Sequence, residues 1–238
     1  MNDSKSKIAR TTQPYLFQNG SLLTDLPVQD LAMLQDKAKT ESFKRGDVLF
    51  RRGAFPKSIY WLKSGKVKIF QETPSGHRQT LYIYSDGDLI GYRQLISEEA
   101  HPVSALLLED SEVTIIPGEI FRSVINSSSF FARNLLAALA REFSVWMNRT
   151  TVFTQFSVRR RLILALLILS EQYRISGSKP GVVTMTRTEL AEYVGATLET
   201  VVRALNKLKA EGFVKISGRQ IVLPDVMGLI TILEKEDA

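Results

Sequence analysis

Three side chains near the start of a predicted helix have the chemical types that read DNA bases. Glu199, Val202 and Arg203 are spaced at i, i+3 and i+4, so a helix presents them on one face. In the major groove an arginine donates two hydrogen bonds to guanine, a glutamate accepts one from cytosine, and an apolar side chain packs on the thymine methyl group. The alternative is a solvated salt bridge between Glu199 and Arg203, which a helix brings together at i, i+4. The elements around this helix distinguish the two interpretations.

Local sequence signals predict a helix-turn-helix around these residues. Thr186 is a suitable N-cap, and Glu189 three positions later completes a capping box. Gly195 supplies the left-handed backbone with which many helices end, and Thr197 caps the second helix. The second helix has a buried face at helical spacing, made of Val201, Ala204, Leu205 and Leu208. Two short helices joined by a glycine turn are typical of the helix-turn-helix motif.

A predicted hairpin follows the second helix directly. Residues 213–216 and 220–223 are strand-like, and the three residues between them contain a turn glycine, Gly218. A helix-turn-helix with such a hairpin is a winged helix, whose second helix enters the major groove. Residues 157–223 also carry 11 Lys and Arg against 5 Asp and Glu, which suits a partner made of phosphates. These features favour base reading over a simple surface salt bridge.

Residues 185–212, MTRTELAEYVGATLETVVRALNKLKAEG, resemble the DNA-binding domain of the Crp/Fnr superfamily of bacterial transcription regulators. The resemblance implies that Glu199 and Arg203 read bases, while Val202 falls where members vary and so alters the sequence read. It also implies roles in holding phosphates or flanking the readers for Thr186, Arg187, Thr188, Thr197 and Thr200. Two of these threonines are also helix caps, so a purely structural role stands beside the functional one.

Strand-like patterns occupy residues 21–128, after a polar segment of residues 1–20 that we expect to be flexible. Short apolar runs alternate with glycine-containing turns, which indicates an antiparallel β-barrel or β-roll. Small barrels often hold a ligand inside, but a packed and empty interior fits the pattern as well. The pattern alone does not choose between these two interiors.

A long helix is predicted over residues 129–156, because residues 130–156 contain no proline or glycine. An apolar stripe at three- and four-residue steps includes Phe131, Leu135, Leu139, Trp146 and Phe153. The stripe can pack on the roll, but a helix of this length between two domains favours packing on its twin across a two-fold axis. Glu142 and Arg149 fall within the stripe and need partners there.

The family resemblance implies that the roll binds or senses an effector. Members that bind cyclic AMP carry a Gly-Glu-Leu segment for the ribose and an Arg-Ser-Ala segment for the phosphate. The corresponding segments here are Gly91-Tyr92-Arg93 and Val103-Ser104-Ala105, so both charged groups are missing. A buried phosphate without its cation loses a charge-assisted contact, which argues against cyclic AMP unless Arg93 substitutes. The expected pocket for an effector of unknown identity comprises Gly91, Tyr92, Arg93, Ser104 and Ala105.

No cofactor or metal site is evident from the sequence. The chain has no cysteine, which excludes a cluster held by cysteine thiolates. His77 and His101 are the only histidines, and both are expected to be solvated loop residues rather than ligands. There is also no phosphate-binding glycine loop and no Ser/His/Asp set, so the sequence indicates that the protein is not an enzyme.

The predicted fold class is α+β, with an N-terminal antiparallel β-roll of jelly-roll type, a long dimerisation helix and a winged helix-turn-helix over residues 157–238. We expect a transcription regulator that binds an inverted repeat of double-stranded DNA as a homodimer and contacts RNA polymerase. The alternatives are an effector-independent regulator of the same fold and a ligand-binding module that acts on a protein partner. The longest apolar run, residues 162–169, is too short to cross a bilayer, so we expect a cytoplasmic protein without a membrane partner.

Overall fold

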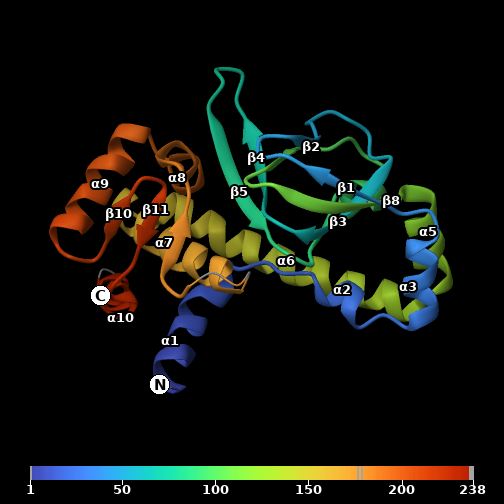
Figure 1. Cartoon of the computed structure of the whole chain (residues 1–238), viewed down its shortest axis with the longest axis horizontal. Coiled ribbons are helices and arrows are strands. Elements are labelled where there is room, and N and C mark those ends of the chain that lie inside the picture. Colours follow the sequence, from blue (N-terminus) through green and yellow to red (C-terminus); the bar gives the residue numbers. More distant parts are fainter. Residues whose placement is uncertain (1, 176, 178, 236–238) are drawn as a thin grey trace. The chain divides into compact units, whose positions relative to one another are not determined.

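The computed structural model describes residues 2–175, 177 and 179–235, and the chain divides into two compact units (Figure 1). One unit is Phe17–Glu142, and the other combines Met1–Leu16 with Phe143–Ala238. The boundary between them falls inside one continuous helix, α6 (Ser129–Gln155). The outer ends of the predicted domains, residues 1 and 238, lie outside the described residues.

Two four-stranded sheets form the β-roll of the Phe17–Glu142 unit. Their strand orders are β1-β8-β3-β6 and β2-β7-β4-β5, and neighbouring strands pair antiparallel. The strands are β1 (Lys39–Phe43), β2 (Val48–Phe50), β3 (Ser58–Ser64), β4 (Val67–Glu72), β5 (Arg78–Tyr84), β6 (Leu89–Ile90), β7 (Ser104–Leu107) and β8 (Ser111–Pro117). The predicted antiparallel roll is therefore confirmed.

Glycine is required at the turn between β3 and β4. Gly65 has a φ of 111°, and a Cβ atom at this position would lie 2.0 Å from Ser111 Oγ. Any other residue here would have a strained backbone, and its Cβ atom would also collide with Ser111 at the start of β8. This close approach explains one of the glycine signals from which the sequence predicted a roll.

Short helices close the roll and complete its core. They are α2 (Ser21–Thr24), α3 (Val28–Gln35), α4 (Tyr92–Ser97) and α5 (Gly118–Ser127). One hydrophobic cluster joins side chains of these helices to the strands and to the start of α6, and Leu34, Ile59, Leu89 and Phe121 are fully buried in it. The rings of Phe121 and Phe131 meet edge to face, with centroids 5.5 Å apart. The core of this unit thus includes the first turns of the long helix.

The predicted dimer stripe on α6 is wrong at its first two positions. Phe131 and Leu135 are buried in the core of their own unit, and Leu139 packs against the same cluster. Trp146 and Phe153 are half-buried. The side of α6 that remains exposed instead presents Leu136, Phe143 and Met147, whose exposed fractions are 67%, 66% and 59%. The helix has two apolar faces, and the sequence pattern does not reveal which one the roll covers.

The prediction that residues 1–20 are flexible is also wrong for most of this segment. Residues 2–12 form helix α1 (Asn2–Thr12), and a 3₁₀ turn follows at Gln13–Tyr15. Helix α1 packs on α7 (Val158–Ile175) and α10 (Val226–Lys235), and Lys7 Nζ lies 2.9 Å from Glu234 Oε2. These partners lie far along the chain, so the polar local sequence gave no sign of them.

The remaining elements of the second unit form the winged helix-turn-helix. They are α7, β9 (Val182–Thr184), α8 (Arg187–Val194), α9 (Leu198–Ala210), β10 (Lys215–Ser217), β11 (Gln220–Val222) and α10. The three strands form an antiparallel sheet in the order β10-β11-β9. Residues 162–169 of α7 are buried, as their uniform apolar character predicts. Among the described helices, none is both long and apolar enough to span a bilayer.

Candidate nucleic-acid interface and roll interior

The first helix of the motif, α8, begins with the predicted capping box. Thr186 Oγ1 accepts a hydrogen bond from Glu189 N at 3.1 Å, and Glu189 Oε2 accepts one from Thr186 N at 2.8 Å. Two backbone N–H groups that a helix N-terminus leaves unpaired are thereby satisfied. Leu190, Ala191 and Val194 are buried on the inner face of α8. Local capping and burial together fix where α8 starts and how it is rotated.

The turn between α8 and α9 is held by a glycine and by an arginine from α7. Gly195 has a φ of 68°, in the left-handed region, and its N–H bonds to Ala191 O at 2.9 Å. Arg161 Nη1 donates to Gly195 O at 3.1 Å. At the next helix, Thr197 Oγ1 accepts from Thr200 N at 3.3 Å. Hydrogen bonds therefore hold the turn both at the end of α8 and at the start of α9.

Helix α9 buries one face and exposes the predicted base readers. Val201, Leu205 and Leu208 are buried. Glu199 and Arg203 have side chains that are 81% and 70% exposed, and Arg203 Nη1 lies 3.8 Å from Glu199 Oε1. An ion pair this long and exposed contributes roughly 0–1 kcal/mol, so it does not hold either side chain firmly. Val202, between them, is half-buried.

The predicted phosphate-contacting residues differ in how much they are already bonded. Arg187 Nη2 donates to Gly218 O at 3.0 Å, which ties the start of α8 to the wing turn. Thr197 and Thr200 share a hydroxyl–hydroxyl hydrogen bond of 2.8 Å at the start of α9. Thr186 is half-buried by its capping role, whereas Thr188 is exposed. All five predicted residues lie at the starts of the two helices of the motif, where backbone N–H groups favour anions.

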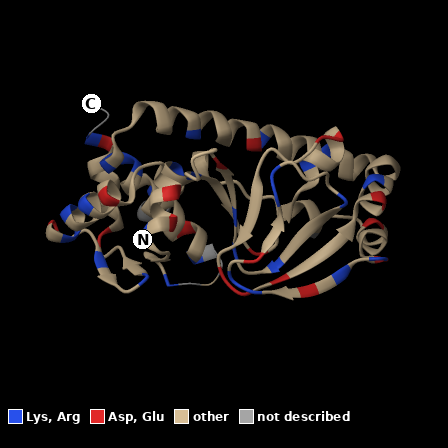
Figure 2. Ribbon diagram, turned by 90° about the horizontal axis from the view of Figure 1, so that it is seen from above, with Lys and Arg blue, Asp and Glu red and all other residues tan. Residues whose placement is uncertain are grey.

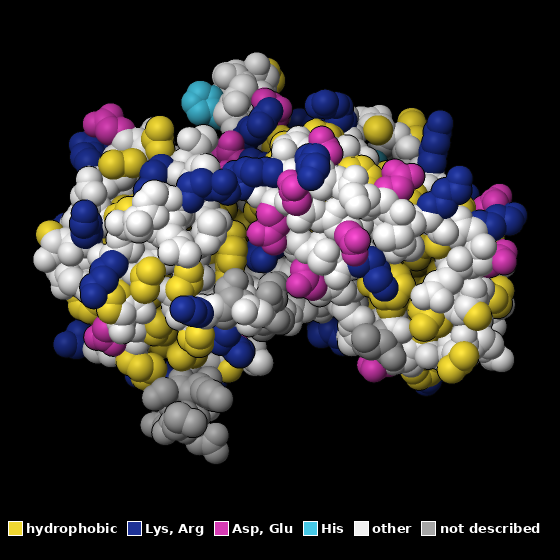
Figure 3. Space-filling model, viewed as in Figure 1, with side chains coloured by type: hydrophobic (Ala, Val, Ile, Leu, Met, Phe, Trp, Pro, Cys, Tyr) yellow, Lys and Arg dark blue, Asp and Glu magenta, His cyan; other side chains and the backbone are white. Residues whose placement is uncertain are grey.

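Basic side chains surround the motif. Lys207 and Lys209 are exposed in α9, and Lys215 and Arg219 are exposed on the wing hairpin. Lys and Arg segments recur along the helices and the hairpin of this unit (Figure 2), and Figure 3 shows basic side chains on its visible surface. Such a surface attracts a polyanion, because the basic side chains replace the counterions condensed on the polyanion and release them into solution. The wing and α9 are thus both suited to a nucleic acid.

The interior of the roll contains a buried ion pair that the sequence did not predict. Arg93 Nη1 lies 3.1 Å from Glu142 Oε1, and the Glu142 side chain is only 4% exposed. Tyr92 OH donates to Glu142 Oε2 at 3.2 Å, and Arg93 Nη2 donates to the hydroxyl of Tyr82. Burial raises the pKa of Glu142, and the Arg93 charge and the tyrosine hydroxyls oppose this rise. The glutamate that interrupted the apolar stripe therefore has its partners within its own unit.

Aromatic rings pack around this ion pair. The rings of Tyr82 and Tyr84 meet edge to face at 5.1 Å, and Phe17 lies 6.4 and 6.2 Å from them. Burial raises the pKa of both tyrosines, so both remain neutral hydroxyls near neutral pH. Tyr82 and Tyr84 lie two residues apart on β5, but Phe17 is distant in sequence, so the sequence did not predict this cluster.

The structure does not gather the five predicted effector residues in one place. Tyr92 and Arg93 belong to the ion-pair cluster, and Ala105 is fully buried. Ser104 instead accepts a hydrogen bond from Arg52 N at 2.9 Å and lines an open groove. Gly91 has a φ of 88°, and a Cβ atom there would lie 3.8 Å from His101 Cε1. The predicted pocket is therefore split between the interior and the outer groove.

His101 is buried, which corrects the expectation that it is a solvated loop residue. Its ring stacks on Phe50 with centroids 3.8 Å apart, and the residue is 2% exposed. Burial, with a contribution from Arg93, lowers the pKa of His101 to about 4. His77, by contrast, is exposed as expected. The described residues contain no group of three or more His, Cys, Asp or Glu arranged to hold a metal ion.

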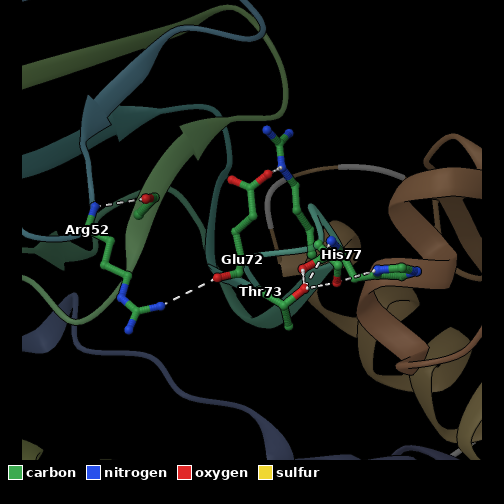
Figure 4. Close-up of polar contacts among 7 residues, drawn as sticks. Arg52, Glu72, Thr73 and His77 are labelled. Carbon is green, nitrogen blue, oxygen red and sulfur yellow. Dashed lines mark hydrogen bonds and ion pairs between the residues drawn. The ribbon is translucent and has the colours of Figure 1, made fainter.

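The outer groove of the roll lies beside the β4–β5 hairpin. Arg51, Arg52 and Arg78 line it together with Glu72 and other side chains. Arg52 Nη1 donates to Glu72 O at 3.4 Å, and Arg78 Nε lies 3.3 Å from Glu72 Oε1. The hairpin turn is closed by hydrogen bonds between Thr73 and His77 (Figure 4). The groove therefore combines three cations with a carboxylate that already engages one of them.

Two known families match separate parts of the chain. The family described as "Cyclic nucleotide-binding domain" matches residues 40–128. The family described as "Crp-like helix-turn-helix domain" matches residues 160–232. The first match covers the roll, and the second covers the winged helix-turn-helix with α9.

The chain is similar to several transcription regulators. The chain is 27% identical to the "Anaerobic regulatory protein" of Haemophilus influenzae over 196 residues, which is 82% of this chain and 76% of that protein. It is 26% identical to the "Transcriptional activator protein anr" of Pseudomonas aeruginosa over 210 residues, covering 87% and 86% of the two chains. The solved structure of FixK2 from Bradyrhizobium japonicum superimposes with a TM-score of 0.73 at 25% identity, covering 82% of this chain and 96% of that one.

Proposed function

We propose that this chain, which belongs to the Crp/Fnr family of transcription regulators, binds an inverted-repeat DNA site as a homodimer. Regulation of transcription by a DNA-binding helix-turn-helix is the activity of the family, and catalysis is not. The observation that best supports sequence-specific DNA binding is the exposed face of α9, where Glu199 and Arg203 project without firm partners. A two-fold dimer presents this face twice, about one helical turn of DNA apart.

In the proposed complex, α9 lies in the major groove. Arg203 donates two hydrogen bonds to a guanine, and Glu199 accepts one from a cytosine. Val202 packs on a neighbouring thymine methyl group. Each half-site therefore contains an essential G·C pair. The exposed Arg203–Glu199 pair opens at little cost when the helix docks, because water already solvates both groups.

Phosphates are held by the starts of the two helices and by the wing. Thr186, Arg187, Thr188, Thr197 and Thr200 are proposed to contact or support the backbone of the DNA. Arg187 reaches the wing through Gly218 O, so its substitution also loosens the wing. These contacts fix the register of the protein on DNA and carry no sequence information of their own.

The exposed side of α6 is proposed as the dimer interface. Leu136, Ala140, Phe143 and Met147 are exposed and follow one another at steps of four, three and four residues. This is the spacing of apolar residues in a two-stranded coiled coil. The face replaces the predicted stripe of Phe131, Leu135, Leu139, Trp146 and Phe153, which contributes to the protein's own core at its first positions.

A further partner and a compartment follow from the proposed function. RNA polymerase is a partner if the protein activates transcription, and exposed loops of the roll such as the β4–β5 hairpin are available to it. The compartment is the cytoplasm, where bacterial DNA is read. The protein acts on DNA rather than only on a protein partner, because its winged unit is basic.

The test starts from selection of DNA by the purified protein from a random duplex pool, without added ligand. Arg203→Ala should then weaken binding to the selected site by about 1–3 kcal/mol per contact and relax the preference at the G·C pair. Arg122→Ala removes an exposed arginine from the roll unit and should leave the affinity unchanged. Equal losses on selected and random DNA would show that Arg203 contacts phosphate instead of a base.

A further inference from the structure

We infer that the ion pair between Arg93 and the buried Glu142 occupies the place of an effector inside the roll, so that the protein binds its DNA site without a cyclic nucleotide in that interior. The inference rests on the proposed function, because its readout is DNA affinity. It concerns the interior of the Phe17–Glu142 unit, which contains the residues matched by the cyclic nucleotide-binding family and, within them, Tyr92 and Arg93 of the expected effector segment.

The first step of the argument is the charge of the interior. A cyclic nucleotide brings one phosphate charge, which a buried site must neutralise with a cation. Arg93 is a guanidinium in this interior, but its charge is already opposed by Glu142 at 3.1 Å. A phosphate that approached Arg93 would have to displace a carboxylate that is 4% exposed, and would leave that carboxylate unpaired. The ion pair therefore selects against anions.

The second step is the space that the ion pair and its neighbours fill. Tyr84 and Tyr92 are among the largest fully buried side chains of the chain. Tyr92 OH and the Tyr82 hydroxyl bond to Glu142 and to Arg93, and the Arg93 guanidinium lies 5.5 Å from the centre of the Tyr82 ring. Glu142 Oε2 thus accepts a hydrogen bond from Tyr92, whereas Glu142 Oε1 meets Arg93 as an ion-pair partner and accepts no hydrogen bond from the described residues. The groups of the cluster therefore oppose one another's charges within the roll.

The third step is what the pair connects. Arg93 lies in α4 of the roll, and Glu142 lies on α6, next to Phe143 of the exposed face proposed for dimerisation. In a regulator of this kind, an effector acts by stabilising one arrangement of the roll against the long helix. Arg93 and Glu142 provide such a link within the chain itself. The link is formed in the chain without a ligand, and in the proposal it supports the DNA-competent arrangement.

The test uses the full-length protein and its selected DNA site. We expect the wild type to bind this site at nanomolar concentrations without ligand. Millimolar cyclic AMP or cyclic GMP should change the dissociation constant less than two-fold, and titration calorimetry should detect no binding of either nucleotide. Glu142→Gln keeps the size of the side chain but removes its charge, and it should weaken binding to DNA at least ten-fold. Arg93→Gln should do the same, because it breaks the same pair from the other side.

The matched control is Glu72→Gln, which makes the same change in the exposed Arg78–Glu72 pair of the roll. It should leave DNA affinity within two-fold of the wild type. Circular dichroism and the melting temperature of each variant separate a lost link from a lost fold. If Glu142→Gln does not fold, ligand titration of the wild type still decides the inference.

The possible failures are distinguishable. Calorimetric binding of a cyclic nucleotide to the wild type, or DNA binding that requires one, would overturn the inference and leave the proposed function intact. Wild-type affinity in both Glu142→Gln and Arg93→Gln would also overturn it, because the pair would then connect nothing. Failure to select any sequence, with or without nucleotides, would reject the proposed function, and the claim of ligand-free DNA binding with it.

Discussion

Arg203 and Arg93 each lie near a glutamate, but only one of the two ion pairs is buried. The Arg203–Glu199 pair is long and exposed, so water competes for both partners and the guanidinium can exchange glutamate for guanine. In the Arg93–Glu142 pair, Glu142 is only 4% exposed and also accepts a hydrogen bond from Tyr92, so release of Arg93 would leave a buried carboxylate without its cation. Burial, more than residue type, makes the first arginine a candidate DNA reader and the second an internal link.

His101 yields a prediction about stability at acidic pH. Its folded-state pKa of about 4 lies below the ordinary value, so between about pH 6.5 and pH 4 the unfolded chain binds a proton that the folded chain does not. Stability from this residue is therefore present above pH 6.5 and lost as the pH falls to 4. His101→Phe keeps a ring stacked on Phe50. We expect its free energy of unfolding to fall by about 1–2 kcal/mol less than that of the wild type over this pH range.

The measurement is urea unfolding of both proteins at several pH values. Asp88, whose pKa burial raises to about 7, changes stability in the opposite direction, but it is present in both proteins and cancels in the difference. His77→Phe is the matched control, because His77 is exposed in the folded state. Parallel pH profiles for wild type and His101→Phe would mean that His101 is protonated as readily when folded as when unfolded.

At the scale of elements, the parts predicted correctly are those whose signals are local. The capping box of Thr186 and Glu189, the left-handed Gly195 and the cap at Thr197 all act within one turn of a helix, and each is present as expected. The strands of the roll were predictable from their glycine-separated apolar runs. The local sequence is sufficient to predict these elements, because their signals do not depend on tertiary contacts.

The elements predicted wrongly depend on contacts that are distant in sequence. Helix α1 is stabilised by α7 and α10, and nothing in its own polar sequence indicates them. The inward face of α6 is chosen by the roll, which covers Phe131 and Leu135. The sequence showed that Glu142 needs a partner, but only the folded roll shows that this partner is Arg93. The burial of His101 has the same origin, since it stacks on a strand far from it in sequence.

The exposed face of α6 gives a prediction about assembly. Leu136→Glu combined with Phe143→Glu should convert a dimer into a monomer. Each copy loses two apolar side chains that are exposed in the single chain and that the proposed interface would bury, at roughly 1.5–3 kcal/mol each. Sedimentation equilibrium of the free protein measures the change directly. Phe55→Glu alters an aromatic residue of similar exposure in the roll and should leave the dimer intact. A doubly substituted protein that still sedimented as a dimer would place the interface elsewhere.

At the scale of the whole molecule, charge is concentrated where DNA is proposed to bind. Residues 157–223 carry 11 Lys and Arg against 5 Asp and Glu, and the full chain has a net charge of +6. Phosphate contacts by this region should make the affinity for DNA fall steeply as salt rises, by counterion release. Acidic and basic positions are interspersed along the ribbon of the roll (Figure 2), which suits a domain that does not follow the DNA backbone.

The central claim is that two copies of the chain read two symmetric half-sites. The most direct measurement compares the affinity of the ligand-free protein for its selected inverted repeat with that for the same duplex after one half-site is scrambled. At constant, physiological salt, we predict two chains bound per intact duplex and at least a hundred-fold loss of affinity on the scrambled one. Equal affinity for both duplexes, with one chain bound to each, would contradict the account.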